Sequence, residues 1–269
     1  MTTGRAQPRL ATILVVAALA STLVAIRAST AANPEHDDFA HDFAQAAQAY
    51  VDGRYDRAQS LFEGLFIAGC RNGDLFFNLG NTYYQRDDLG EAIRAYRRAE
   101  LYEPRDPDLR HNLAVARGQV AQPVGRAGLL YAVRSFAFWY DLSTHRELAL
   151  ASVAAWVALC AAFAWRYASG SVASGAASFA AALGLALLGG SWGAKHYELT
   201  RVDSDVVVNG EAEVHAGPSA TQPVAFTAAE GTEVTSVASE GGYRKIVRAD
   251  GRQGWIRSDQ LVPVRLDQE

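Results

Sequence analysis

The sequence of 269 residues is poor in cysteine and lysine, with two of each, and its formal net charge is −4 at pH 7. Two cysteines cannot build a disulfide framework or a four-ligand zinc site, and Cys70 and Cys160 lie far apart in the chain. Nucleic-acid binders need clustered lysine and arginine to contact phosphates, and no such cluster is evident. We therefore expect no disulfide, no metal site, no cofactor and no nucleic-acid partner.

Charged residues are also missing from three long stretches, 10–26, 148–165 and 172–192. The remaining segments are polar enough to be soluble in water, although the average composition is that of an ordinary soluble protein. This segregation is typical of a membrane-attached protein with globular parts.

The first uncharged stretch has the features of a secretory signal. Arg5 and Arg9 precede it, and small residues follow it through Ala32. We expect residues 1–32 to be a signal peptide. The alternative is an uncleaved N-terminal anchor, because the stretch is long for a signal. Both readings place the chain that follows outside the cytoplasm.

The other two stretches approach the length of about 20 residues that crosses a membrane. The connection 166–171 is too short to hold a domain, so residues 147–193 are predicted to form a transmembrane hairpin whose flanking domains share one side. The distribution of lysine and arginine does not decide the orientation. Combined with the signal, the hairpin predicts an inner-membrane protein with both soluble domains on the periplasmic side.

Small residues recur every four positions in the second span, at Ala176, Ala180 and Gly184 and again at Ala182, Ala186 and Gly190. Such stripes let helix backbones approach closely in lipid. We expect them to pack on the first span, with self-association or docking onto another membrane protein as alternatives.

Residues 121–146 link the soluble part to the hairpin. The aromatic cluster in 129–140, beside Arg134, suits the headgroup region of a membrane. Thr144 and Glu147 then form a capping-box pattern, which predicts that the first spanning helix begins there.

The most specific pattern lies in residues 73–106. Large and small residues recur there with the spacing of two antiparallel helices, at Phe76, Leu79, Gly80, Tyr83, Ala92, Tyr96, Ala99 and Pro104. The small residues let the helices cross closely, and the large ones fill the gaps around them. The segment resembles a tetratricopeptide repeat.

A shift of 34 residues backward gives a degenerate first repeat, and a shift forward gives a single capping helix. Residues 33–120 are therefore predicted to form an all-α tetratricopeptide array. Its five helices are expected at 37–51, 54–68, 73–86, 89–102 and 107–119.

Tetratricopeptide arrays bind peptides or protein surfaces along the face formed by their first helices. The resemblance assigns this partner-binding face to Phe43, Ala47, Tyr50, Phe77, Asn78, Asn81, Tyr84, Gln85, Asp108, His111 and Asn112. Asn78 and Asn81 can hydrogen-bond an extended backbone. The basic residues of the carboxylate-clamp subclass are absent, so capture of a chaperone C-terminus is not expected. The sequence shows no catalytic arrangement of a nucleophile and a base, and no phosphate-binding loop. We therefore expect that the protein is not an enzyme.

Residues 203–265 change to short alternating apolar runs separated by glycine and proline turns, which predicts a small all-β barrel. The dipeptides Asp250-Gly251 and Gly254-Trp255 stand where a bacterial SH3 domain has them, and the segment resembles that domain. We expect its aromatics, Trp255 above all, to fill the core, and segment 203–269 to fold alone. Tyr243 beside His215 is the candidate ligand face.

The order of signal, repeats, aromatic hairpin and SH3 domain resembles the BatE family of aerotolerance proteins. The likeness includes the stretches 78–81, 106–112 and 138–143. It implies work beside von Willebrand factor A membrane proteins and a MoxR-type ATPase, in an envelope or oxidative-stress function.

Two hypotheses follow. The first is a non-catalytic membrane-anchored scaffold that holds a protein partner in the repeat groove. The alternative is a cell-wall protein that binds peptidoglycan through the SH3 domain, with the repeats as a spacer.

Overall fold

The computed structural model describes residues 36–120, 138–201 and 203–265. The predicted signal and the aromatic residues before Phe138 lie outside this part of the chain. The chain divides into two compact units. One contains the apolar hairpin, residues 145–196, and the other combines residues 35–144 with 197–269.

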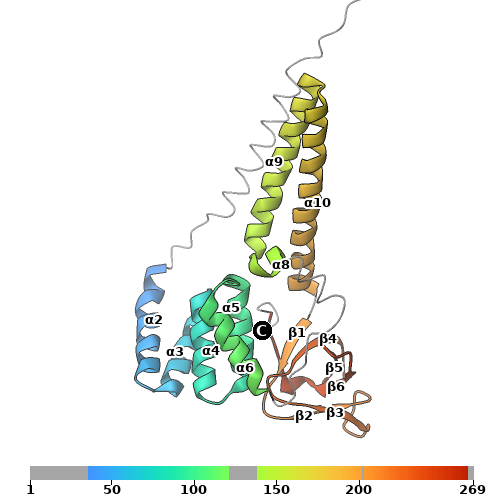
Figure 1. Ribbon diagram of the computed structural model, residues 1–269. Coiled ribbons are helices and arrows are strands. Elements are labelled where there is room, and N and C mark those ends of the chain that lie inside the picture. Colours follow the sequence, from blue (N-terminus) through green and yellow to red (C-terminus); the bar gives the residue numbers. More distant parts are fainter. Residues whose placement is uncertain (1–35, 121–137, 202, 266–269) are drawn as a thin grey trace, which may run out of the picture. The chain divides into compact units, whose positions relative to one another are not determined.

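Five helices form the N-terminal part of the larger unit, and the prediction for each boundary is confirmed to within one residue (Figure 1). They are α2 His36–Val51, α3 Tyr55–Ile67, α4 Gly73–Gln85, α5 Leu89–Tyr102 and α6 Pro107–Gln119. Local chemistry fixes their starts. The Asn72 side chain accepts a hydrogen bond from the Leu75 amide at the start of α4, and Asp106 caps α6 with Pro107 at its first turn.

The helices of the central repeat cross as closely as the small residues predict. A Cβ atom on Gly80 of α4 would lie 2.5 Å from the Tyr96 ring of α5. Ala92 and Ala99 are completely buried on the same helix. A larger residue at any of these positions would force the helices apart.

Two helices are long and apolar enough to cross a membrane, judged by length and composition: α9 His145–Ser169 and α10 Val172–Arg201. A short helix, α8 Phe138–Leu142, precedes them. Helix α9 begins directly after Thr144, where the capping-box pattern predicts it.

The small-residue stripes of α10 do not pack on α9 in this structure, so that expectation is wrong. The buried positions of α10 are Ser174 and Ser178, whereas Ala176 and Ala180 are exposed. Two residues along a helix turn a side chain by about 200°, which puts these pairs on opposite faces. The second stripe, Ala182, Ala186 and Gly190, is exposed as well.

Residues 203–265 form seven antiparallel strands in the order β3-β2-β6-β5-β4-β1-β7. The strands are β1 Asp203–Val207, β2 Ala212–His215, β3 Val224–Ala228, β4 Glu233–Glu240, β5 Tyr243–Arg248, β6 Gln253–Arg257 and β7 Leu261–Pro263. The all-β prediction is confirmed, with one correction. Strands β3 and β7 are the edges of the sheet and do not pair with each other, so the predicted barrel is not closed.

The helical array and the sheet share one hydrophobic core within the larger unit. Val206 of β1, Ala229 and Val264 are buried in the same cluster as Ile93 and Tyr96 of α5. Strands β1 and β7 lie against α5. The sheet therefore covers the outer face of the last complete repeat, and segment 203–269 taken alone would expose this apolar surface.

Candidate functional site

A hollow of about 140 Å³ opens on the face formed by the first helices of the repeats. Its walls come from α2, α4, α5 and α6 and consist of Tyr50, Asn81, Tyr84, Gln85, Tyr96, Asn112 and Val115. Five of these residues belong to the predicted face. Tyr96 and Val115 do not, because the repeat signature assigns Tyr96 to the core and gives Val115 no role. Val115 lies about one helical turn after Asn112, so the two residues are on the same side of the helix, and this spacing could have added Val115 to the predicted face.

Asn81 is held by hydrogen bonds at the base of the hollow. Its side-chain Oδ1 accepts from the Tyr96 hydroxyl and from Nδ2 of Asn112, each at 2.8 Å. Because Tyr96 is 1% exposed, this bond satisfies a hydroxyl that water does not reach. Burial raises the pKa of Tyr96, so the hydroxyl stays protonated as a donor at neutral pH. Asn81 thus serves the fold as well as the hollow.

Two further tyrosines line the wall of the hollow. Gln119 Nε2 donates to the Tyr84 hydroxyl oxygen. Burial raises the pKa of Tyr50, although Gln85 acts in the opposite direction. The Tyr50 phenol is therefore neutral at physiological pH and keeps its own O–H.

The other predicted residues of the face lie outside the hollow. Phe43 packs edge-on against Phe62, with ring centroids 5.4 Å apart, and Phe77 lies 6.2 Å from Tyr96. Asn78 donates to the main-chain oxygen of Asp74. Ala47 also packs against the core of the array, and Asp108 and His111 are exposed on α6.

A second candidate surface lies on the outer side of the sheet. His215 of β2 is paired in register with Trp255 of β6, which is paired with Lys245 of β5. Tyr243 meets His215 edge-on at 6.3 Å, and His215 Nδ1 donates to the main-chain oxygen of Gln222 at 2.9 Å. The predicted pair His215 and Tyr243 therefore lies together, but His215 is buried, at 6% exposure, so that only half-buried Tyr243 of the two reaches the surface.

Trp255 does not fill the core, which corrects the sequence-based expectation. Its neighbours Gly254 and Ile256 are buried, and Trp255 between them is only half-buried. A Cβ atom on Gly254 would lie 2.6 Å from Val214 Cγ1, so the strand approaches β2 too closely there for any side chain. Strand alternation then turns Trp255 outward.

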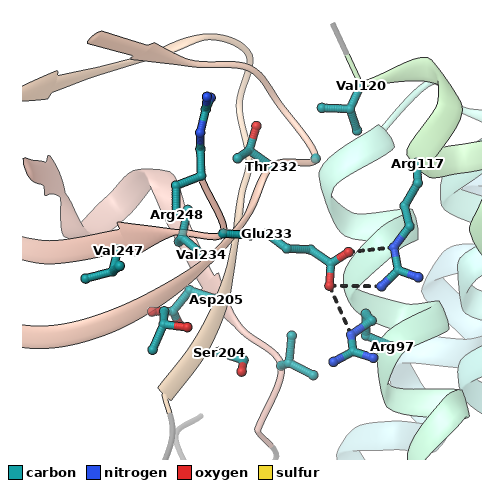
Figure 2. Close-up of a pocket in the computed structure, with 14 residues that line it drawn as sticks. Arg97, Arg117, Val120, Ser204, Asp205, Thr232, Glu233, Val234, Val247 and Arg248 are labelled. Carbon is teal, nitrogen blue, oxygen red and sulfur yellow. Dashed lines mark hydrogen bonds and ion pairs between the residues drawn. The ribbon is translucent and has the colours of Figure 1, made fainter. Parts of the chain in front are cut away.

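Charged side chains join the helices to the sheet. Figure 2 shows Glu233 of β4 reaching toward the helices, where its carboxylate accepts from Arg117 at 2.6 and 3.0 Å. Arg97 Nε lies 3.1 Å from the same carboxylate. These residues line a crevice of about 670 Å³, in which Glu233 pairs with both arginines and Arg97 also pairs with Glu100.

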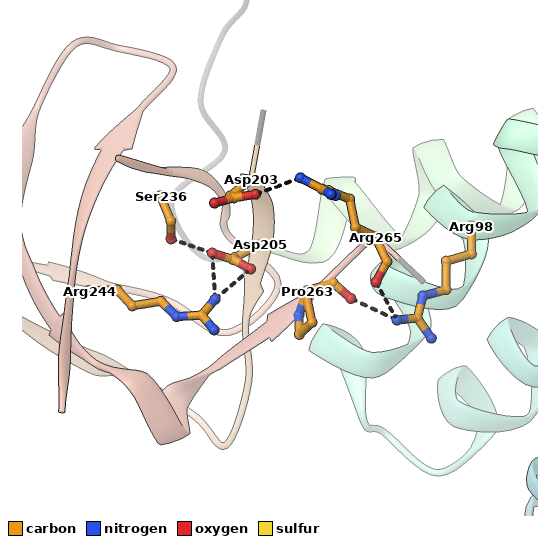
Figure 3. A network of polar contacts seen from close by, with 7 residues as sticks. All are labelled: Arg98, Asp203, Asp205, Ser236, Arg244, Pro263 and Arg265. Atoms are coloured by element: carbon orange, nitrogen blue, oxygen red, sulfur yellow. Dashed lines mark hydrogen bonds and ion pairs between the residues drawn. The ribbon is translucent and has the colours of Figure 1, made fainter. Parts of the chain in front are cut away.

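Arg98 of α5 is the most deeply buried of these arginines, at 2% exposure. Its guanidinium donates to the main-chain oxygens of Pro263 at 2.9 Å and of Arg265 at 3.3 Å (Figure 3). It also donates to the main-chain oxygen of Val264 at 2.9 Å. A single side chain thus satisfies three carbonyl groups at the end of the sheet, which secures the sheet to the array.

Beside this contact, Asp205 of β1 is buried within the sheet. It accepts hydrogen bonds from Ser236 and from Arg244, the latter at 3.1 Å (Figure 3). Burial raises the pKa of Asp205 despite these partners. The network has a structural explanation, because it joins three neighbouring strands.

Among the described residues, no group of three or more histidine, cysteine or acidic side chains is placed to hold a metal ion.

Comparison with known families finds similarity in two parts of the chain. The family described as TPR repeat matches residues 80–120, and the bacterial SH3 domain matches residues 208–263. No curated protein matches the chain. Domains of these two kinds are typically non-catalytic. The first binds other proteins, and the second is associated with binding to the cell wall outside the cytoplasm.

Proposed function

We propose that the protein is a non-catalytic, membrane-anchored scaffold that holds an extended segment of a protein partner in the hollow between α2, α4 and α6. The observation that carries the proposal is the hollow itself, which is lined by the first helices of successive repeats. Its lining includes neutral polar side chains, which are the groups that can hydrogen-bond the main chain of a ligand.

The hairpin α9–α10 anchors this unit. In the proposed topology, residues 33–147 and 193–269 both lie on the periplasmic side of the inner membrane, after a signal in residues 1–32. The short turn between the helices, in which Gly170 has a φ of 59°, supports the shared side because it leaves no room for a domain. Reporter fusions that work only outside the cytoplasm should be active after residue 120 and after residue 269. Activity at one site alone contradicts the hairpin topology.

The likeness to the BatE family supports the finer proposal that this scaffold works in a Bat-type envelope or oxidative-stress complex. Its partners would then be von Willebrand factor A membrane proteins, in a system that includes a MoxR-type ATPase.

Site-specific photo-crosslinking tests the scaffold function. A photoreactive residue replaces Gln85, which is exposed at the hollow, in the full-length protein in its own membrane. Replacement of exposed Arg57 on α3 is the matched control. We expect protein adducts of defined mass from position 85 and none from 57, and their loss when Val115→Trp fills the hollow. Identical adducts from both positions contradict the proposal.

The second candidate function is binding to peptidoglycan through the outer face of the sheet. The outward, half-buried rings of Trp255 and Tyr243, with Lys245 beside Trp255, favour it, because aromatic rings at a surface can stack on a sugar. A sedimentation assay of the full-length protein with purified peptidoglycan, compared with Trp255→Ala, decides whether this face binds.

A further inference from the structure

We propose that the hollow between α2, α4 and α6 takes a proline-containing segment in the extended polyproline II conformation. The inference rests on the proposed scaffold function and names the chemical class of its ligand. It follows from the charge, the shape and the hydrogen-bonding capacity of the walls.

The hollow has no charged side chain in its walls. The lining consists of three tyrosines, two asparagines, one glutamine and one valine. The nearest arginine along α4, Arg86, is paired with Asp56 and Asp88. A charged ligand side chain would lose its hydration in the hollow without gaining a counter-ion, which is unfavourable. The ligand group that enters is therefore uncharged.

The shape of the hollow suits a compact ring. The rings of Tyr50 and Tyr84 line a volume of about 140 Å³ above buried Tyr96, and Val115 lines it from α6. Aromatic-lined grooves of this kind recognise polyproline II segments, whose rigid conformation loses little entropy on binding.

The walls offer more donors than acceptors. Both acceptor positions of Asn81 Oδ1 are used by Tyr96 and Asn112, so the Asn81 side chain presents only its N–H groups to a ligand. The Tyr84 hydroxyl oxygen accepts from Gln119, which leaves its O–H as a donor, and the Tyr50 hydroxyl adds a second O–H to the wall.

Proline has a carbonyl oxygen but no main-chain N–H. A proline-containing segment therefore supplies acceptors to the donors of the hollow without bringing donors that would remain unpaired. Asn112 Oδ1 is available to accept the N–H of a flanking residue that is not proline. In a peptide without proline, every residue would bring an N–H group, and the side-chain amide oxygens left to accept these in the hollow are Asn112 Oδ1 and Gln85 Oε1.

Fluorescence anisotropy with two synthetic peptides tests this ligand class on the full-length protein in detergent. One probe contains a central run of four prolines flanked by uncharged residues, and the other replaces those prolines with alanine. We expect the proline probe to bind at least tenfold more tightly. Equal affinities, or tighter binding of the alanine probe, overturn the proposal.

Variants locate the site. Tyr50→Phe with Tyr84→Phe keeps both rings and removes two donors, and it should weaken the proline probe at least fivefold, whereas Tyr102→Phe on the other side of the array should not. Unchanged affinity in the double variant contradicts the donor argument.

A second pair of variants tests the location of the site. Val115→Trp should abolish binding of the proline probe, and Ala114→Trp, on the preceding residue but outside the hollow, should preserve it. Because this second pair does not touch the hydroxyls, it decides the location even where the double variant fails to fold.

The outcome separates this inference from the scaffold function. If neither peptide binds but position 85 still crosslinks to a partner in a manner that Val115→Trp abolishes, the hollow binds protein and the proline assignment is wrong. If the crosslinks are also absent, the scaffold function fails as well.

Discussion

The helical array has two faces with opposite roles. The hollow on the face formed by α2, α4 and α6 is lined by neutral side chains, whereas the outer face of α5 is closed by the sheet through apolar contacts and buried Arg98. In the proposed function, the interactions for stability and those for binding therefore lie on different sides of the array. Asn81 is the exception, because it supports buried Tyr96 while also lining the hollow.

The largest effect is expected where the sheet meets α5. Arg98→Ala removes the donors of three carbonyl groups in the segment that ends the sheet. Leaving buried acceptors unpaired should lower the free energy of unfolding by about 3 kcal/mol or more. Urea denaturation of the full-length protein in detergent measures it, with exposed Arg110→Ala as the control, expected to change stability by less than about 0.5 kcal/mol. Equal effects would show that the sheet does not stabilise the array.

The second-largest loss of stability is expected from overpacking inside the array. Gly80→Leu pushes a side chain into the Tyr96 ring and should cost about 1–3 kcal/mol. Gly64 is the matched control on α3, because a Cβ there meets no atom within 4 Å. Gly64→Leu should be neutral or stabilising by about 0.5–1 kcal/mol through helix propensity. Thermal unfolding followed by circular dichroism compares them, and similar melting temperatures would contradict the close crossing.

Two glycines with positive φ distinguish the effect of backbone strain from the effect of packing against the helices. Replacing Gly231 (φ 81°) or Gly251 (φ 86°) by alanine should destabilise the protein by about 1 kcal/mol through backbone strain alone. Only Gly231 faces the helices, where a Cβ would lie 2.8 Å from Ile93 Cδ1. Gly231→Ala should therefore be the more destabilising by about 1 kcal/mol in urea denaturation. Equal losses would mean that the turn does not pack on α5.

The parts of the fold that depend on residues close together in the sequence could be predicted, and the parts that depend on residues far apart could not. The helices of the array were predictable because Gly80, Ala92 and Pro104 recur with a local period that reflects helix crossing. The contact between the sheet and α5 was not predictable. Arg98 and Val264 are 166 residues apart, and no local period records their pairing.

The candidate sites show the same limit. Tyr50, Asn81 and Tyr84 were identified from the repeat face alone, whereas the inward bonding of Asn81 depends on Tyr96 in another helix. Trp255 was placed inside because the core of so small a domain was expected to need its aromatic residues. The face of the sheet on which Trp255 lies is determined by its neighbour Gly254, which packs closely against β2 on the inner face. That close approach depends on the register between the strands.

The smallest effect on stability is expected at the outer face of the sheet. Trp255→Ala should lower the free energy of unfolding by less than about 1.5 kcal/mol, because the ring is half-buried outside the core. Ile256→Ala, on the adjacent buried position, should cost about 2–5 kcal/mol. A larger loss from Trp255→Ala would return that ring to the core and remove the candidate wall-binding face.

The separation of the two faces is tested most directly by measuring binding and stability together on Val115→Trp. Val115 is 40% exposed and lines the hollow without contributing to the buried core. Crosslinking from position 85 and the melting temperature are measured on the same membrane preparations. We predict that the partner adduct is lost while the melting temperature stays within about 2 °C of the unmodified protein. Retention of the adduct with the hollow filled would contradict binding at this face, and loss of folding would contradict its independence from the core.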